Sequence, residues 1–194
     1  EAGLPAVALN VVTGVGVEAG AALSSHLDIN HISFTGSLRT GEAVQAAAAK
    51  NAVPVTLELG GKSPQIVFAD ADIERALPFL VNAGIQNAGQ TCSASSRILV
   101  QRDVYEQVIA GMSERYRALK VGAAEADLSL GPVVSVRQKA IVEDYLKLAE
   151  QDGLQIAAQG ELTADAPENG AYVRPTLLRD VPPQHRLAQE EIFG

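Results

Sequence analysis

The sequence predicts an α/β fold in two parts, with a largely parallel sheet. Short apolar runs alternate with helical stretches along the chain, and this order is typical of parallel strands covered by helices. Within the helical stretches, apolar residues recur at three- and four-residue steps, which gives each helix one face to bury. A flexible pair, Gly60-Gly61, follows a predicted strand and indicates the boundary between the two parts.

The first part, residues 1–59, shows this alternation in its simplest form. Apolar runs predict strands at 7–12, 32–35 and 54–58, and helical composition predicts helices at 18–25 and 38–50. Strands and helices in this order predict a parallel sheet with helices packed on it.

The second part, residues 60–194, repeats the theme. Residues 65–68, 97–101 and 172–178 are predicted strands, and the polar stretch 160–170 is a predicted loop. One helix begins at 70–72, a second follows the strand at 97–101, and a capping-box pattern from Ser135 to Gln138 opens a third. The faces expected to be buried are Ile73, Ala76, Leu77, Leu80 and Val81 in the first helix, Val104, Val108, Met112 and Tyr116 in the second, and Ile141, Val142, Tyr145, Leu146 and Ala149 in the third.

Composition excludes several classes of function. The net charge of −8 and the pI of about 4.9 argue against binding to nucleic acid or to an anionic membrane, because both need a basic surface. No apolar run reaches the ~18 residues of a membrane span. The single cysteine cannot form an internal disulfide, which favours a cytoplasmic location. The three histidines have no metal-ligand spacing, so we expect no metal. Both ends of the chain look cut, so we expect a central fragment of a longer protein.

Cys92 is the first candidate for chemistry. It lies in the run Gly89-Gln90-Thr91-Cys92-Ser93, whose small residues would let a substrate approach the thiol. A thiolate is a strong nucleophile when positive potential or a helix N-terminus favours its formation. A free cysteine is, however, also among the most buried residue types and is usually inert.

Glu58 is the second candidate. It follows Val55-Thr56-Leu57 and precedes Leu59, so its neighbours along the chain are apolar. An apolar setting raises the pKa of a carboxyl group and suits it to act as a general base near neutral pH. The alternative is a glutamate at a strand end that points into water.

The segment Phe34-Thr35-Gly36-Ser37 joins a predicted strand to a predicted helix. A glycine turn at a helix N-terminus offers free N–H groups and a positive dipole end to a phosphate. Taken alone, the segment is better explained as an ordinary strand–turn–helix corner with a serine N-cap.

Four motifs together resemble the NAD(P)-dependent aldehyde dehydrogenase family. They are Phe34-Thr35-Gly36-Ser37, the run 57–64 around Glu58, the run 89–93 around Cys92, and Glu190-Glu191-Ile192-Phe193-Gly194. They occur in the family's order at about the family's spacing. The resemblance implies an aldehyde dehydrogenase-like fold, in which residues 1–59 end a Rossmann-type cofactor-binding domain. Residues 60–194 would then form the N-terminal and central part of an α/β catalytic domain.

The resemblance also implies roles for individual residues. Cys92 would add to an aldehyde, forming a thiohemiacetal and then a thioester, and Glu58 would activate Cys92 or the hydrolytic water. Glu191 would hold the nicotinamide ribose, while Lys62 is either a partner of a carboxylate in the proton path or a surface lysine. The positions expected to contact NAD or NADP are Phe34, Thr35, Gly36, Ser37, Gly41, Leu59, Gly60, Gln138, Glu191 and Phe193.

The implied activity is oxidation of a small-molecule aldehyde to a carboxylic acid by a homodimer or homotetramer. The fragment alone is expected to be inactive. Two alternatives stay open. One is a non-catalytic family member that serves as a structural or binding protein. The other is a cofactor-independent thiol hydrolase, which would need folding to bring a histidine to Cys92.

Overall fold

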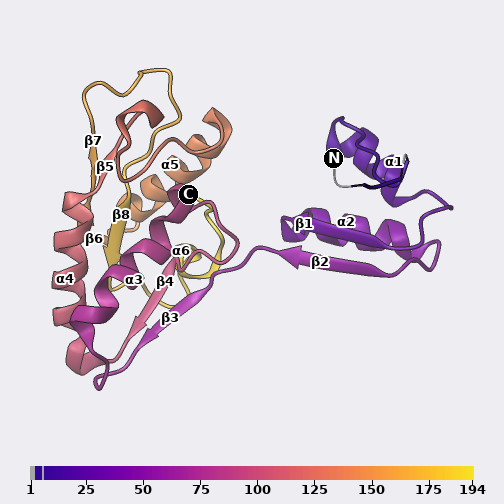
Figure 1. Ribbon diagram of the computed structural model, residues 1–194. Helices are drawn as coiled ribbons and strands as arrows, with labels where there is room; N and C mark the ends of the chain where they lie inside the picture. Colours follow the sequence, from indigo (N-terminus) through magenta and orange to yellow (C-terminus); the bar gives the residue numbers. More distant parts are fainter. Residues whose placement is uncertain (1–2, 6) are drawn as a thin grey trace. The chain divides into compact units, whose positions relative to one another are not determined.

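The chain divides into two units, Glu1–Gly60 and Gly61–Gly194, and a computed structural model describes residues 3–5 and 7–194. Figure 1 traces the elements of each unit. The division falls at the glycine pair Gly60-Gly61. The assignment of the units to cofactor-binding and catalytic domains stays a prediction.

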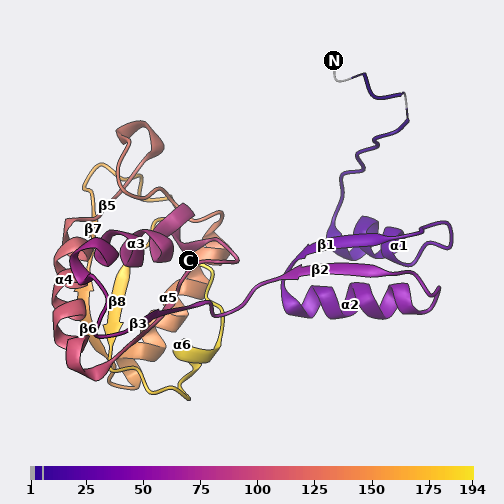
Figure 2. The same ribbon diagram turned by 60° about the horizontal axis from the view of Figure 1, so that its bottom comes forward.

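A parallel strand pair with a helix along it is the centre of the first unit. Strand β1 (Ile32–Gly36) pairs with β2 (Val55–Leu59), and α2 (Leu38–Ala49) connects them. Before them lie a π-helical turn η1 (Gly16–Gly20) and the short helix α1 (Ala21–Ser24). Figure 2 shows α2 running alongside the two strands. These elements agree with the predicted strands and helices between residues 18 and 58 to within two residues at each end.

Helix α2 and the strands approach closely because Gly41 has no side chain. A Cβ atom at Gly41 would lie 2.7 Å from Leu59 Cδ2 and 3.7 Å from Leu57 Cδ2. Leu57 and Leu59 therefore face the helix. Side chains alternate along a strand, so Glu58 faces the opposite side, where its register partner Thr35 is also exposed.

The strand predicted at 7–12 is not present. Residues 7–9 form a turn and bend and residues 10–15 are irregular, without a strand partner among the described residues. Val7 has φ 65°, a left-handed conformation that a β-branched residue rarely adopts. An apolar run becomes a strand only when another strand accepts its hydrogen bonds, and sequence alone does not supply that partner.

The second unit is built on three strand pairs with helices around them. Strand β3 (Pro64–Val67) pairs with β4 (Arg97–Val100), and β5 (Lys120–Val121) pairs with β7 (Glu161–Leu162), both in parallel. Strand β6 (Gln155–Gln159) pairs with β8 (Thr176–Arg179) in antiparallel fashion. The helices are α3 (Ile73–Ile85), α4 (Tyr105–Ala118), α5 (Val136–Gln151) and α6 (Arg186–Gln189), with 3-10 turns η2 (Gln86–Gly89), η3 (Arg102–Val104) and η4 (Ala124–Ala126).

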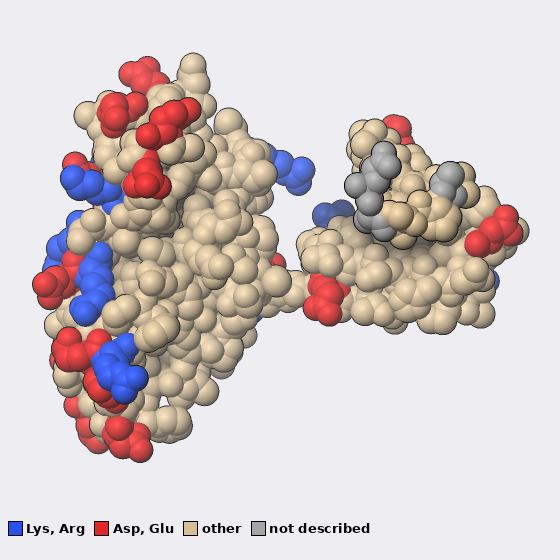
Figure 3. Space-filling view, in the orientation of Figure 1, with Lys and Arg blue, Asp and Glu red and all other residues tan. Residues whose placement is uncertain are grey.

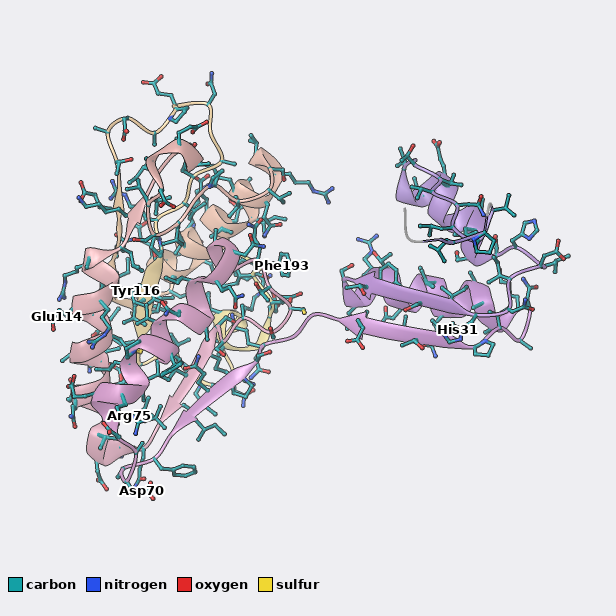
Figure 4. All side chains as sticks on the ribbon, viewed as in Figure 1. His31, Asp70, Arg75, Glu114, Tyr116 and Phe193 are labelled. Carbon is teal, nitrogen blue, oxygen red and sulfur yellow. The ribbon has the colours of Figure 1, made fainter. Side chains whose placement is uncertain are left out.

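The core of this unit lies where α3 and α4 meet each other and the strands. Leu77 and Met112 are each 1% exposed, and Val108 is 2% exposed. The predicted apolar faces of these two helices are confirmed, because Ile73, Leu80, Val81 and Tyr116 are buried with them. Figure 4 shows Tyr116 pointing from α4 into this interior.

Charge and hydrophobicity are unevenly spread over the surface of the second unit. Figure 3 shows charged side chains gathered along the α4 side and a broad uncharged area over α3, β3 and β4. Exposed apolar side chains on or next to these elements include Ile66, Phe68, Phe79 and Leu99. Among the residues that the structure describes, no helix is long and apolar enough to cross a membrane.

Several short elements of the second unit differ from the sequence-based expectation. The strand predicted at 172–178 begins only at Thr176, and the loop predicted at 160–170 contains β7. Strands β5 and β7 have two residues each, too few to give a periodic pattern. Strand β6 was not expected, since alanine and glutamine are poor strand formers, and its antiparallel pairing departs from the parallel pattern of the rest.

Replacing Leu77 by alanine should destabilise the second unit. We expect a loss of about 3 kcal/mol in the free energy of unfolding, because the side chain is 1% exposed and its removal leaves a cavity. Phe79→Ala is the matched control, since Phe79 lies in the same helix but is 75% exposed, and it should change the free energy by less than about 0.5 kcal/mol. Urea unfolding followed by circular dichroism measures both. Equal losses would contradict a core between α3 and α4.

Candidate functional site

Cys92 is exposed in a turn between η2 and β4, within the second unit. The backbone leading to it is unusual, because Asn87, Ala88 and Gly89 have φ angles of 52°, 53° and 80°. Left-handed conformations cost a non-glycine residue roughly 1–2 kcal/mol, so surrounding contacts must hold this segment. We call residues 86–93 the Cys92 loop.

Asn87 and Gln90 supply those contacts. Asn87 Nδ2 donates to the Gln90 carbonyl at 3.1 Å, and Gln90 Nε2 donates to the Asn87 carbonyl at 3.0 Å. The Gln90 side chain also reaches outside the loop, where its Oε1 accepts a hydrogen bond from Val134 N at 2.7 Å. The loop is thereby fixed internally and tied to the residues just before α5.

The other end of the described chain packs directly against this loop. A Cβ atom at Gly89 would lie 2.8 Å from the carbonyl carbon of Gly194. One at Gly194 would lie 2.5 Å from Val142 Cγ2 on α5. Both positions therefore lack room for a side chain. We call residues 190–194 the 190–194 segment.

The two adjacent acids of the 190–194 segment have different contacts. Glu190 forms paired hydrogen bonds with Arg186, at 2.9 Å from Nε and 2.8 Å from Nη2, and accepts a third from Tyr145 Oη at 2.6 Å. The bonds to Arg186, and then the bond to Tyr145, lower the pKa of Glu190 to about 2. Glu190 therefore links α6 to α5.

Glu191 instead faces the start of the unit. Its Oε1 accepts one hydrogen bond from Gly61 N, at 3.3 Å. Burial, and next the charge of Arg97, lower the pKa of Lys62 to about 8, while the charge of Glu191 opposes the shift. Lys62 is thus a half-buried group under the influence of Glu191, rather than a free surface lysine.

Gln138, in the first turn of α5, contacts the 190–194 segment. Its backbone N–H donates to Ser135 Oγ at 3.1 Å, which is one half of the predicted capping box. Its side chain does not return to Ser135 but donates from Nε2 to the carbonyls of Ile192 and Phe193, each at 2.9 Å. Its predicted contact with an adenosine ribose stays a prediction, and its observed contacts support the 190–194 segment.

A cavity of about 590 Å³ lies inside the second unit beside these groups. Its lining includes Lys62, Thr91, Glu191 and Phe193. Thr91 precedes Cys92 in the chain, but Cys92 itself does not line the cavity. Phe193, labelled in Figure 4, is 39% exposed and lies at the surface with φ 62°. Of the predicted site residues, Glu191 and Phe193 line this cavity, and Gln138 bonds the backbone of their segment. Cys92 belongs to the loop that packs against the same segment through Gly89.

The predicted cofactor residues of the first unit form the corner between β1 and α2. Ser37 is the N-cap of α2, and its Oγ accepts a hydrogen bond from Thr40 N at 3.3 Å. The Phe34 ring lies across Gly36, where a Cβ atom would be 2.6 Å from Phe34 Cζ. Thr35 is exposed, and Gly60 is half-buried at the end of the unit. Gly41 and Leu59 pack against each other, so their observed role is the contact between α2 and β2.

The apolar surroundings expected for Glu58 are not found within the first unit. Leu57 and Leu59 flank Glu58 in sequence, but they point to the α2 side of the strand while Glu58 is exposed on the other side. Sequence neighbours in a strand therefore do not describe its environment. Glu58 and Cys92 belong to different units, and their pairing stays a prediction.

Sequence reasoning missed the residues that hold the site together. Gln90, Tyr145 and Arg186 had no assigned role as tethers, yet they fix the Cys92 loop and the 190–194 segment. The four-residue spacing of Arg186 and Glu190 is a recognisable helix ion-pair signal. Gln90 and Tyr145 contact residues 44 and 45 positions away, for which a single sequence offers no signal. Within the described residues, no group of three or more His, Cys, Asp or Glu side chains could hold a metal ion.

The comparisons with known proteins identify the family. The model of the aldehyde dehydrogenase family matches residues 1–194. This chain belongs to the aldehyde dehydrogenase family. It is 46% identical to an aldehyde dehydrogenase of Emericella nidulans over 197 aligned positions, which cover 100% of this chain and 39% of that protein. The chain thus spans about two fifths of the length of the curated relatives it matches.

Solved structures establish the same fold. An inferred aldehyde dehydrogenase from Burkholderia cenocepacia has a TM-score of 0.97 and 60% identity, covering 99% of this chain and 40% of that one. A betaine aldehyde dehydrogenase from Staphylococcus aureus, solved in complex with NAD+, has a TM-score of 0.88 and 37% identity over 94% of this chain and 37% of its own. The α/β aldehyde dehydrogenase fold predicted from the sequence is therefore confirmed.

Loss of the Glu190 charge should weaken the attachment of the 190–194 segment in a pH-dependent way. The pKa of Glu190 falls from 4.5 to about 2 on folding, so its stabilising effect is present above pH 4.5 and is lost as the pH falls toward 2. Glu190→Gln should therefore lower the melting temperature at pH 7, and the gap from wild type should narrow below pH 4.5. Glu168→Gln, in an exposed loop, is the control. A gap that is constant between pH 7 and pH 3 would contradict the Arg186–Glu190 attachment.

Proposed function

We propose that the protein containing this chain oxidises an aldehyde to a carboxylic acid with NAD+ or NADP+, using Cys92 as nucleophile. The observation that carries the proposal is the packing of the Cys92 loop against the 190–194 segment. This packing joins the loop that carries the exposed Cys92 thiol to the segment that carries Glu191 and Phe193. The family resemblance gives these two positions the nicotinamide ribose and ring.

The residues present fit a nicotinamide cofactor. Among the described residues, Glu191 accepts a single hydrogen bond, to Oε1 at 3.3 Å. A carboxylate has about four acceptor positions, so acceptor capacity is left for two ribose hydroxyls. Phe193 is partly exposed and offers a flat apolar surface to a ring. When bound, the cofactor accepts a hydride from the substrate carbon.

The chain's own residues account for the remaining steps. The Cys92 thiolate adds to the aldehyde carbonyl, and the Cys92 backbone N–H is a donor for the oxyanion of the resulting thiohemiacetal. Departure of hydride leaves a thioester on Cys92. Water activated by a carboxylate then cleaves the thioester, releases the acid and restores the thiol.

Glu58 is the carboxylate we assign to water activation. Its exposure on the outer side of β2 leaves it free to bind water, and Gly60-Gly61 two residues later gives the connection flexibility. By family resemblance, an acid at this position favours water over coenzyme A as the acyl acceptor.

We further propose the setting in which the reaction occurs. The substrate is a small-molecule aldehyde, the location is cytoplasmic, and the complete protein is a homodimer or homotetramer. Because the chain covers about two fifths of its relatives, we expect activity from the complete protein and not from this chain alone.

Among residues 61–194, the thiol-hydrolase alternative finds no histidine free to act on Cys92. Of the three in the sequence, His26 and His31 belong to the first unit. His185 uses both ring nitrogens elsewhere, since Nδ1 accepts from Leu187 N at 3.1 Å and Nε2 bonds Asp152 Oδ2 at 3.0 Å. Within the second unit, His185 is thus already committed to capping α6.

Cys92→Ala in the complete protein should abolish aldehyde oxidation. We expect turnover to fall by more than about a thousandfold, because no bond to the substrate can form. The absorbance of reduced nicotinamide measures turnover with a panel of aldehydes. Ser93→Ala is the control, since it changes the adjacent exposed position and should keep most activity. Unchanged turnover in Cys92→Ala would rule out the dehydrogenase mechanism.

Glu58→Gln should separate the two halves of the reaction. Hydride transfer should persist as a burst of reduced cofactor, while steady-state turnover falls by about a hundredfold because the thioester waits for unactivated water. Stopped-flow absorbance resolves the two phases. Glu42→Gln, at an exposed position of α2, is the control. Full steady-state activity in Glu58→Gln would refute its role as base.

A further inference from the structure

We propose that residues 133–138, which we call the α5 start, are a positioning element that sets the Cys92 loop relative to the 190–194 segment. Gln90 and Gln138 are its two tethers. The inference rests on the proposed function, because it concerns how that site is assembled.

The first tether connects the Cys92 loop to the α5 start. Gln90 Oε1 accepts from Val134 N at 2.7 Å, while its Nε2 donates to Asn87 O at 3.0 Å. The same amide group therefore satisfies a backbone donor before α5 and a backbone acceptor inside the loop. Because Asn87 and Ala88 are left-handed, the loop has a conformation that depends on such outside contacts.

The second tether connects the α5 start to the 190–194 segment. Gln138 Nε2 donates to both Ile192 O and Phe193 O, at 2.9 Å each. A side-chain amide has two N–H donors, so both are used by these carbonyls. Only Oε1 is left to contact a ligand, which makes Gln138 a support for Glu191 and Phe193 rather than a donor to a ribose.

Close packing makes the two tethers act together. Gly89 of the Cys92 loop and Gly194 touch through their backbones, and Gly194 in turn touches Val142 of α5, with no space for a Cβ atom at either contact. Movement of the 190–194 segment away from α5 would therefore remove the surface on which Gly89 rests. The loop and the segment share one support, so loss of either tether should change the alkylation rate of Cys92.

The test uses the complete protein with Gln138→Met and Gln90→Met, which keep side-chain length but remove the amide. Gln151→Met is the matched control, at the exposed far end of the same helix. Two readouts are compared. One is kcat and the KM for NAD+ or NADP+, and the other is the rate at which iodoacetamide alkylates Cys92 without cofactor, followed by peptide mass mapping.

We expect Gln138→Met to lower kcat roughly tenfold, the order expected from losing one or two hydrogen bonds, with a smaller change in KM. We also expect the cofactor-free alkylation rate of Cys92 to change several-fold in both Gln90→Met and Gln138→Met, and not in Gln151→Met. A direct ribose contact by Gln138 would instead raise KM alone and leave alkylation unchanged, and that result would overturn the proposal.

A second pair of variants keeps the test decisive if Gln138→Met does not fold. Gln138→Lys can still donate to the two carbonyls, whereas Gln138→Glu has similar reach but cannot donate when ionised. The proposal requires Gln138→Lys to keep the wild-type alkylation rate more closely than Gln138→Glu does, and equal rates would overturn it. If the wild-type protein reduces neither cofactor with any aldehyde, the proposed function is wrong. The alkylation experiment would still decide the positioning role.

Discussion

The contact between Gly89 and Gly194 is the constraint on which the candidate site depends. It joins the nucleophile loop to the segment that carries Glu191 and Phe193, and it works only because neither position has a side chain. Around it, hydrogen bonds from Gln90 and Gln138 and the Arg186–Glu190–Tyr145 cluster hold each partner to α5. Helix α5 is therefore the support of the site, although it contributes no predicted nucleophile or base.

The two adjacent acids, Glu190 and Glu191, differ in their electrostatic surroundings. Hydrogen bonds from Arg186 and Tyr145 lower the pKa of Glu190 to about 2, so Glu190 is a charged tether at neutral pH. In the part of the chain that the structure describes, Glu191 accepts one long hydrogen bond, from Gly61 N. Its charge partly offsets the burial and the Arg97 charge that lower the pKa of Lys62. Removing Glu191 would therefore affect Lys62 as well as any ribose, so the effect of a Glu191 variant should not be assigned to cofactor binding alone.

Strands β1 to β4 and β8 could be predicted from their apolar runs. The longer helices α2 to α5 could be predicted from the sequence, because they repeat their apolar or helix-favouring pattern over several turns, whereas the four-residue α6 was not predicted. The faces of α3 and α4 are examples, and Leu77, Met112 and Tyr116 are buried as expected. The strand predicted at 7–12 is not formed, because a strand needs a partner to accept its hydrogen bonds. Strands β5 and β7 are too short to give a pattern in the sequence. At the site, Cys92 and Glu191 could be found from their motifs. The tethers Gln90 and Tyr145 could not, since their partners lie far along the chain.

In the proposed reaction, Cys92 carries the acyl group between oxidation and hydrolysis. The most direct measurement is the mass of the Cys92 peptide after complete Glu58→Gln protein is mixed with an aldehyde and oxidised cofactor and then quenched in acid. We expect an acyl group on Cys92 that appears only when both aldehyde and cofactor are present. Formation of reduced cofactor with an unmodified Cys92 at every quench time would contradict it.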